Sequence, residues 1–217
     1  MKFILLAEGA TEIIAVAGLL KRWLDSRLTK EKVRVEPVPL GGWANFRKEV
    51  VKRAQAHLDG PERREIIAVI GLLDLYGPTF WPRHCRTFKE RHDWGVKHFE
   101  KAVRRAKFRM FFAVHEVEAW ILSQPEMFPI EVRASVAKLA TKPEEVNFDH
   151  PPSKRLSDLY NAKTGRSYKK TTDGKALFQK LDPDMAAGKC PGLQAMLSEM
   201  LRLAENHEQD KGMKAKG

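Results

Sequence analysis

Cysteine is scarce in this chain of 217 residues: only Cys85 and Cys190 occur, far apart and without a C-x-x-C spacing. Two such residues exclude a disulfide-rich framework and a cysteine-rich zinc site. His84, His92 and His98 do not combine with Cys85 at the spacing of a standard zinc site. This cysteine usage is typical of a reducing compartment, so we expect a cytoplasmic protein.

Long apolar runs are also missing. No stretch approaches the roughly 18 apolar residues that a membrane-spanning helix requires. The apolar segment after Lys2 is interrupted at Glu8, so we expect neither a secretory signal peptide nor a membrane partner. The sequence also has no G-x-x-x-x-G-K-[ST] loop, which argues against a nucleotide-binding P-loop protein.

Acidic residues are few relative to basic ones, with 28 Asp and Glu against 39 Lys and Arg, which gives a formal net charge of +11. A positive balance of this size attracts polyanions, and nucleic acid is the partner that we expect. The alternative is a basic surface that is simply solvated.

The chain is rich enough in hydrophobic residues, at 43%, to form a well-developed core. Short apolar segments alternate with helical patterns, which predicts an α/β fold with a mainly parallel, Rossmann-like sheet flanked by helices. We expect strands at residues 2–7, 33–40, 66–73 and 108–114, and helices at residues 12–28, 43–58 and 94–106.

After Pro129 the strand signals fade and helical patterns take over. These patterns cover residues 132–139, 153–160, 174–181 and 193–204. We therefore divide the chain into an α/β core at residues 1–124, a helical subdomain packed on it at residues 125–206, and a flexible tail at residues 207–217.

Acidic side chains follow three of the four predicted strands: Glu8, Asp74, and Glu116 with Glu118. The carboxyl ends of parallel strands share one edge of the sheet, so these groups are expected to meet there. Carboxylate oxygens are the ligands that Mg²⁺ and Mn²⁺ prefer, and a cation would offset their mutual repulsion. Glu118 is the favoured third ligand, and the other glutamate would face solvent or cap a helix.

Two of these positions allow other interpretations. Asp74 also fits the first residue of an Asx turn before Tyr76-Gly77-Pro78. His115 does not belong to a zinc-protease H-E-x-x-H motif, because Ala119 occupies the second histidine position. We predict that His115 either moves a proton or contacts phosphate beside the carboxylates, or that it hydrogen-bonds a neighbouring strand.

Basic residues of the C-terminal half are candidates for nucleic-acid binding. Ser153 is expected to be the N-cap of a helix, which places Lys154 and Arg155 in the first turn, where the helix dipole disfavours cations. Their placement is explained if they contact a substrate phosphate or a site carboxylate. Lys169 and Lys170 have the same two interpretations, and a solvated basic face is the alternative for all four.

The segment Leu6-Ala7-Glu8-Gly9-Ala10-Thr11-Glu12 resembles the first motif of Toprim domains, the catalytic α/β domains of topoisomerases, bacterial primases and overcoming-lysogenization-defect nucleases. The chain is more narrowly similar to an uncharacterised bacterial Toprim-like family. The resemblance extends to Leu73-Asp74-Leu75-Tyr76-Gly77, His115-Glu116-Val117-Glu118-Ala119-Trp120, Pro152-Ser153-Lys154-Arg155-Leu156, and Tyr160 with Lys169 and Lys170.

This resemblance implies a Toprim-like fold and a Mg²⁺-dependent nuclease, in which Glu8 is a general acid or base or a metal ligand. Asp74 matches the first aspartate of the family's Asp-x-Asp metal motif, and Tyr76 stands in place of the second. It also implies a possible partner ATPase in defence against phage. The alternative is a Toprim-shaped nucleic-acid-binding or adaptor module that has lost efficient catalysis, which the replacement at Tyr76 favours.

Overall fold

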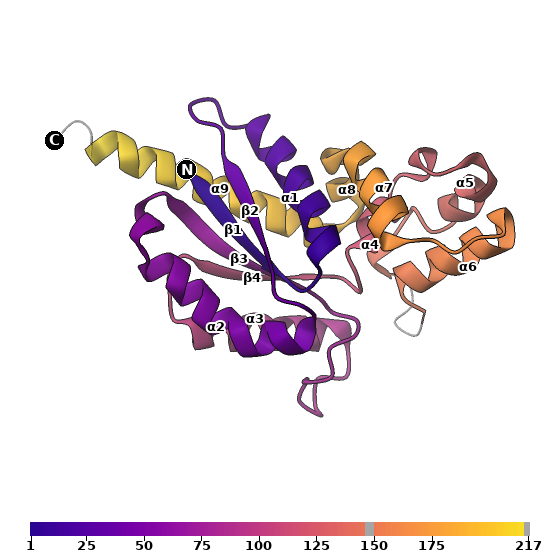
Figure 1. The fold of residues 1–217 in the computed structure, drawn as a ribbon, viewed down its shortest axis with the longest axis horizontal. Helices are drawn as coiled ribbons and strands as arrows, with labels where there is room; N and C mark the ends of the chain where they lie inside the picture. The colour runs from indigo at the N-terminus through magenta and orange to yellow at the C-terminus, as the bar shows by residue number, and fades with distance from the viewer. Residues whose placement is uncertain (146–149, 215–217) are drawn as a thin grey trace.

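A parallel sheet with the strand order β2-β1-β3-β4 forms the centre of the protein (Figure 1). The computed structural model describes residues 1–145 and 150–214, except for the side chains of residues 10–12 and 211–214. All three strand pairings are parallel. The strands are β1 (Lys2–Ala7), β2 (Arg34–Pro39), β3 (Ile66–Asp74) and β4 (Phe108–Ala113). The predicted α/β class and all four predicted strands are confirmed.

Helices cover both faces of this sheet (Figure 1). Alternate residues of a strand point to opposite faces of the sheet. Phe3 and Leu5 of β1 therefore belong to the hydrophobic cluster of one face, and Ile4 and Leu6 belong to the cluster of the other face. The upper layer contains α1 (Ala10–Asp25) and α9 (Pro191–Lys214), and the lower layer contains α2 (Trp43–Asp59) and α3 (Phe88–Val103).

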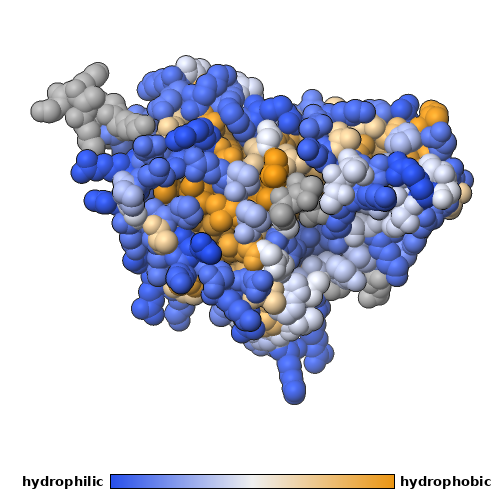
Figure 2. Space-filling model, in the orientation of Figure 1, coloured by the Kyte–Doolittle hydropathy of each residue, from blue (hydrophilic) through white to orange (hydrophobic). Residues whose placement is uncertain are grey.

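The edge strand β2 is protected against pairing with a further strand. The N–H groups of Arg34 and Leu40 donate to the carbonyls of Met1 and Ala7, on the side of β1. The backbone nitrogens of the odd-numbered residues between them therefore face away from β1, towards the open edge. Two of these positions are Pro37 and Pro39, which have no N–H to offer. An apolar area lies over this part of the molecule in Figure 2, and the prolines limit its use as a template for aggregation.

The remaining helices gather beyond the carboxyl edge of the sheet, at the right of Figure 1. They share one continuous hydrophobic cluster with α1, in which Leu156, Tyr160 and Phe178 belong with Ile13 and Leu19. They are α4 (Glu118–Leu122), α5 (Ile130–Ala137), α6 (Pro152–Thr164), α7 (Lys175–Lys180) and α8 (Pro183–Lys189), with the short turns η2 (Pro125–Met127), η3 (Pro143–Glu145) and η4 (Lys170–Gly174). A further short turn, η1 (Pro61–Arg64), lies directly before β3, at the opposite edge of the sheet. The predicted helical C-terminal region is therefore present.

Several helix boundaries differ from the prediction. Helix α9 extends to Lys214, into the segment expected to be a flexible tail from residue 207, and residues 205–211 include the good helix formers Glu205, Glu208, Gln209 and Lys211. Helix α3 begins at Phe88 because Thr87 and Glu90 form a capping box there. Residues 215–217 of the predicted tail lie outside the described residues. No helix within the described residues is both long and apolar enough to cross a bilayer.

Candidate functional site

Glu8 and Asp74 follow the two central strands at their carboxyl ends. Glu8 comes directly after β1, and Asp74 is the last residue of β3. The two strands are neighbours, with Ala7 paired to Leu72. The chain leaves β1 towards β2 on one side, whereas it leaves β3 towards β4 on the other. The strand order therefore reverses between Glu8 and Asp74, and this is where open α/β sheets bind their ligands.

The two carboxylates line one small cavity with a volume of about 20 Å³. This space holds roughly one water molecule or one small ion. The other lining residues are Ala7, Gly9, Ile13, Val16, Leu72 and Val117. Because none of these side chains is polar, the walls solvate charge poorly, and an ionised carboxylate inside the cavity requires compensation.

Asp74 has the most perturbed electrostatic environment of this edge. Its side chain is buried, and its Oδ1 accepts a hydrogen bond of 3.2 Å from the N–H of Val117. Burial, followed by the charges of Glu8 and Glu118, raises the pKa of Asp74 well above its usual value, and Lys170 partly opposes this rise. Carboxylates from three distant segments therefore act on one another, as the positions after the strands predict.

Glu118, at the start of α4, is paired with a lysine of the C-terminal helices. Its side chain is 1% exposed, and its Oε1 lies 3.1 Å from Nζ of Lys170. A buried carboxylate is stabilised by such a partner, since removing one member of a buried ion pair is strongly destabilising. Lys170 was a candidate for nucleic-acid contact or for contact with a site carboxylate, and the structure shows the second.

Glu116 satisfies the first turn of α6. Its Oε2 accepts the N–H of Ser153 at 2.8 Å, and its Oε1 accepts the Ser153 hydroxyl at 2.8 Å. The expectation that Ser153 is the N-cap is wrong: Pro151 is the N-cap, and α6 begins at Pro152. A proline fits the first helical position because its missing N–H needs no acceptor, while the carboxylate of Glu116 binds the next amide. One of the two glutamates thus caps a helix, as expected, and Glu116 is not free to act as a ligand.

His115 lies in the connection that follows β4. It adopts a left-handed backbone conformation with φ +66°, and its carbonyl accepts the N–H of Tyr76 at 2.9 Å. Its ring is 6.1 Å from that of Phe88, and burial lowers the pKa of the imidazole. His115 does not line the cavity between Glu8 and Asp74. Its observed contacts connect this segment to the end of β3.

The other basic candidates are spread over the C-terminal helices. Arg155 donates from Nε to the carbonyl of His150 at 3.2 Å. Lys154, in the first turn of α6, and Lys169, before η4, are both exposed. Together with the pairing of Lys170, this means that the four predicted residues have three different environments.

A pair of glycines that the sequence analysis did not select fixes the backbone of Glu8. The N–H groups of Gly41 and Gly42 donate to the Glu8 carbonyl at 3.0 and 2.9 Å. Both glycines have positive φ angles, +75° and +87°. The available signal was the Gly-Gly dipeptide directly after the predicted strand at residues 33–40, which is typical of a turn that requires such angles.

We expect Gly42→Ala to cost about 1–3 kcal/mol of unfolding free energy, because φ +87° with ψ 161° is a conformation that side chains other than glycine rarely adopt. Gly188→Ala is the control, since Gly188 lies in α8 with open space around the position of a new Cβ. Urea unfolding measures both. Equal stability of the two variants would show that the turn beside Glu8 imposes no strain.

The donor atoms at this edge suit a hard divalent cation, although the side chains do not form a complete cage. Among the residues whose side chains are described, no three or more His, Cys, Asp or Glu stand together in a position to hold a metal ion. Glu8 and Asp74 nevertheless share a cavity of ion size. Mg²⁺ commonly binds through one or two carboxylates and keeps waters that a phosphate can displace. These two residues therefore fit Mg²⁺ as a pair, without Glu116 and Glu118.

Comparison with known proteins leaves the assignment at the level of a family. No curated protein and no solved structure matches the chain. A family model described as a domain of unknown function (DUF4276) matches residues 7–201, a span that includes Glu8, Asp74 and the helices up to α9. The chain therefore belongs to the family DUF4276, a domain of unknown function.

Proposed function

We propose that this protein is a Mg²⁺- or Mn²⁺-dependent cytoplasmic enzyme that cleaves phosphodiester bonds in nucleic acid, with Glu8 and Asp74 as its central residues. The observation that carries the proposal is the buried Asp74, whose pKa is raised by burial and by the charges of Glu8 and Glu118. Such a perturbed group in a cavity is typical of a functional site. The net charge of +11 supports a polyanionic substrate, and the resemblance to Toprim motifs supports the reaction class.

In this proposal Glu8 and Asp74 hold the cation, which supplies stabilisation of negative charge on the phosphate and activation of a water molecule when it is bound. The N–H of Val117 orients Asp74 by its hydrogen bond to Oδ1. Glu8 is half-buried and more accessible than Asp74, so an attacking water can reach its carboxylate. In this proposal Glu8 acts as the general base that accepts the proton of that water. Lys170 forms an ion pair with Glu118 beside them.

The second candidate is a nucleic-acid-binding or adaptor module without efficient cleavage. Tyr76 favours it, because the residue that stands in place of a second aspartate is an exposed aromatic side chain. In this candidate Glu116 and Glu118 do not supply the missing ligand, because they bind Ser153 and Lys170. A partner ATPase, which the Toprim resemblance implies, remains part of both candidates.

Incubation with single-stranded DNA, double-stranded DNA and RNA separates the two candidates, with Mg²⁺ or Mn²⁺ against EDTA. We expect cutting only with the metal, and a decrease of about a hundredfold or more in Glu8→Gln and in Asp74→Asn. Glu49→Gln is the control, because Glu49 is partly exposed on α2 and pairs with Arg53. Binding without cutting under every condition would instead support the adaptor.

A further inference from the structure

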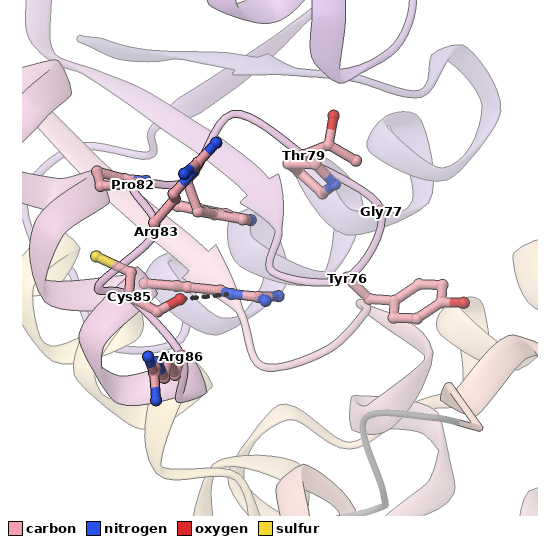
Figure 3. Close-up of a pocket in the computed structure, with 10 residues that line it drawn as sticks. Tyr76, Gly77, Thr79, Pro82, Arg83, Cys85 and Arg86 are labelled. Atoms are coloured by element: carbon pink, nitrogen blue, oxygen red, sulfur yellow. Dashed lines mark hydrogen bonds between the residues drawn. The ribbon is translucent and has the colours of Figure 1, made fainter.

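We propose that the loop after β3 forms a second part of the binding site, a pocket for a phosphate group of the nucleic-acid backbone. The pocket has a volume of about 660 Å³, within the range of nucleotide-sized ligands. Its lining contains Arg83, Arg86 and Arg91 and no acidic side chain (Figure 3). The inference rests on the proposed function, because it assigns part of the same substrate to this loop.

Two of these arginines are not neutralised by other side chains. The side chains of Arg83 and Arg86 are exposed and make no ion pair or hydrogen bond with the part of the chain that the structure describes. Other arginines of the chain do have partners, and they include Arg105 with Asp59, Arg109 with Glu199 and Arg166 with Asp173. Guanidinium groups without an internal carboxylate are suited to phosphate, whose oxygens accept their paired hydrogen bonds.

The loop that carries these arginines is held in place from both sides. Arg91, on α3, donates from Nε to the carbonyl of Cys85 at 3.3 Å, the bond drawn in Figure 3. The N–H of Cys85 donates to the carbonyl of Pro82 at 2.9 Å. Trp81 anchors the loop to the core, with its ring 5.7 Å from that of Phe112. The pocket is therefore built before a ligand arrives, which lowers the entropic cost of binding.

The pocket opens at the same edge of the sheet as the carboxylates. Tyr76 lines it and lies two residues after Asp74 in the chain. In Figure 3, Tyr76 is at one end of the group of lining residues, and Arg83 and Arg86 lie on either side of Cys85. A strand whose reacting phosphate is at Glu8 and Asp74 can pass Tyr76 and place a flanking phosphate among the arginines.

The test is the affinity of a fluorescein-labelled single-stranded DNA oligonucleotide, measured by anisotropy in EDTA over a range of salt concentrations. We expect the double variant Arg83→Gln/Arg86→Gln to weaken binding about tenfold, and to reduce the slope of log K against log salt by about 0.7 for each phosphate that the variant no longer binds. The control is Arg63→Gln/Arg64→Gln in η1, which precedes β3 at the opposite edge of the sheet and removes the same charge. We expect the control to stay within about twofold, as a rim charge should.

Equal weakening by the two double variants would overturn the pocket, because binding would then follow net charge alone. An unchanged affinity of Arg83→Gln/Arg86→Gln would overturn it as well. Since EDTA removes the cation, this assay does not depend on cleavage. If the arginine variant weakens binding but no metal-dependent cutting is seen, the proposed enzyme is contradicted and the pocket stands. If cutting requires Asp74 but the arginine variant binds normally, the pocket is contradicted and the proposed enzyme stands.

Discussion

Asp74→Asn will be more stable than the unsubstituted protein at neutral pH, although it is expected to abolish cleavage. Asparagine keeps the oxygen that accepts the Val117 N–H, and it removes a charge that burial and the charges of Glu8 and Glu118 oppose. A gain of about 1 kcal/mol corresponds to a rise in Tm of about 2–4 °C for a chain of this size. Stability of this kind is commonly given up at functional sites.

The sign of this effect depends on pH. The pKa of Asp74 is higher in the folded protein than its ordinary value of 3.8, so the folded state binds the proton more tightly than the unfolded state. The stability contributed by protonated Asp74 is fully present below that ordinary value and is lost as the pH rises through the folded-state pKa. The difference in Tm between Asp74→Asn and the unsubstituted protein should therefore be smallest in acid and increase towards neutral pH.

Thermal unfolding between pH 4 and pH 8 measures this difference. Asp210→Asn is the control, because Asp210 is exposed on α9. A lower Tm of Asp74→Asn at every pH, or a difference that does not change with pH, would show that no repulsion acts on Asp74. A control variant with the same pH dependence would assign the effect to net charge instead.

Lys170→Met should produce the largest decrease in stability. Glu118 is 1% exposed, and the substitution removes the ammonium group 3.1 Å from its Oε1. Removing one partner of a buried ion pair costs about 3–5 kcal/mol, and we expect about 2–4 kcal/mol here because the side chain of Lys170 is 36% exposed and solvent screens the pair. Urea unfolding gives the free energy directly.

The neighbouring Lys169 offers a matched control for this prediction. Its side chain is exposed, so Lys169→Met should change the unfolding free energy by less than about 0.5 kcal/mol. The double variant Lys170→Met/Glu118→Gln should recover part of the stability, because it removes the charge that was left behind. Equal destabilisation by Lys169→Met and Lys170→Met, or no recovery in the double variant, would contradict the role of the pair.

The sheet and its acidic edge could be predicted because the signals for them are local. Each strand is a short apolar run bounded by polar residues, and Glu8 and Asp74 end such runs directly. Since strands that are linked by crossover helices run parallel, the two carboxylates had to reach the same edge. Helix α4 was missed for the opposite reason: all five of its residues are buried, so it has no amphipathic pattern.

The partners of the remaining site residues could not be predicted, because they depend on how the C-terminal helices fold back on the sheet. Ser153 and Lys170 are distant in sequence from Glu116 and Glu118, and no periodicity connects them. The sequence left a substrate phosphate and a site carboxylate open as the contact of Lys170, because composition does not show which cations are already paired. The irregular segment from Tyr76 to Arg83 follows a strand directly and could be expected to line a site, but nothing in its pattern selects Arg83 and Arg86 as contacts.

The central claim is that Glu8 and Asp74 together bind a divalent cation. Titration with Mn²⁺, followed by electron paramagnetic resonance, tests it without any assumption about a substrate. We predict that the unsubstituted protein and Glu49→Gln bind Mn²⁺ in competition with Mg²⁺, and that Glu8→Gln and Asp74→Asn weaken this binding about tenfold or more. Absence of binding in the unsubstituted protein, or equal binding in all four proteins, would contradict the account.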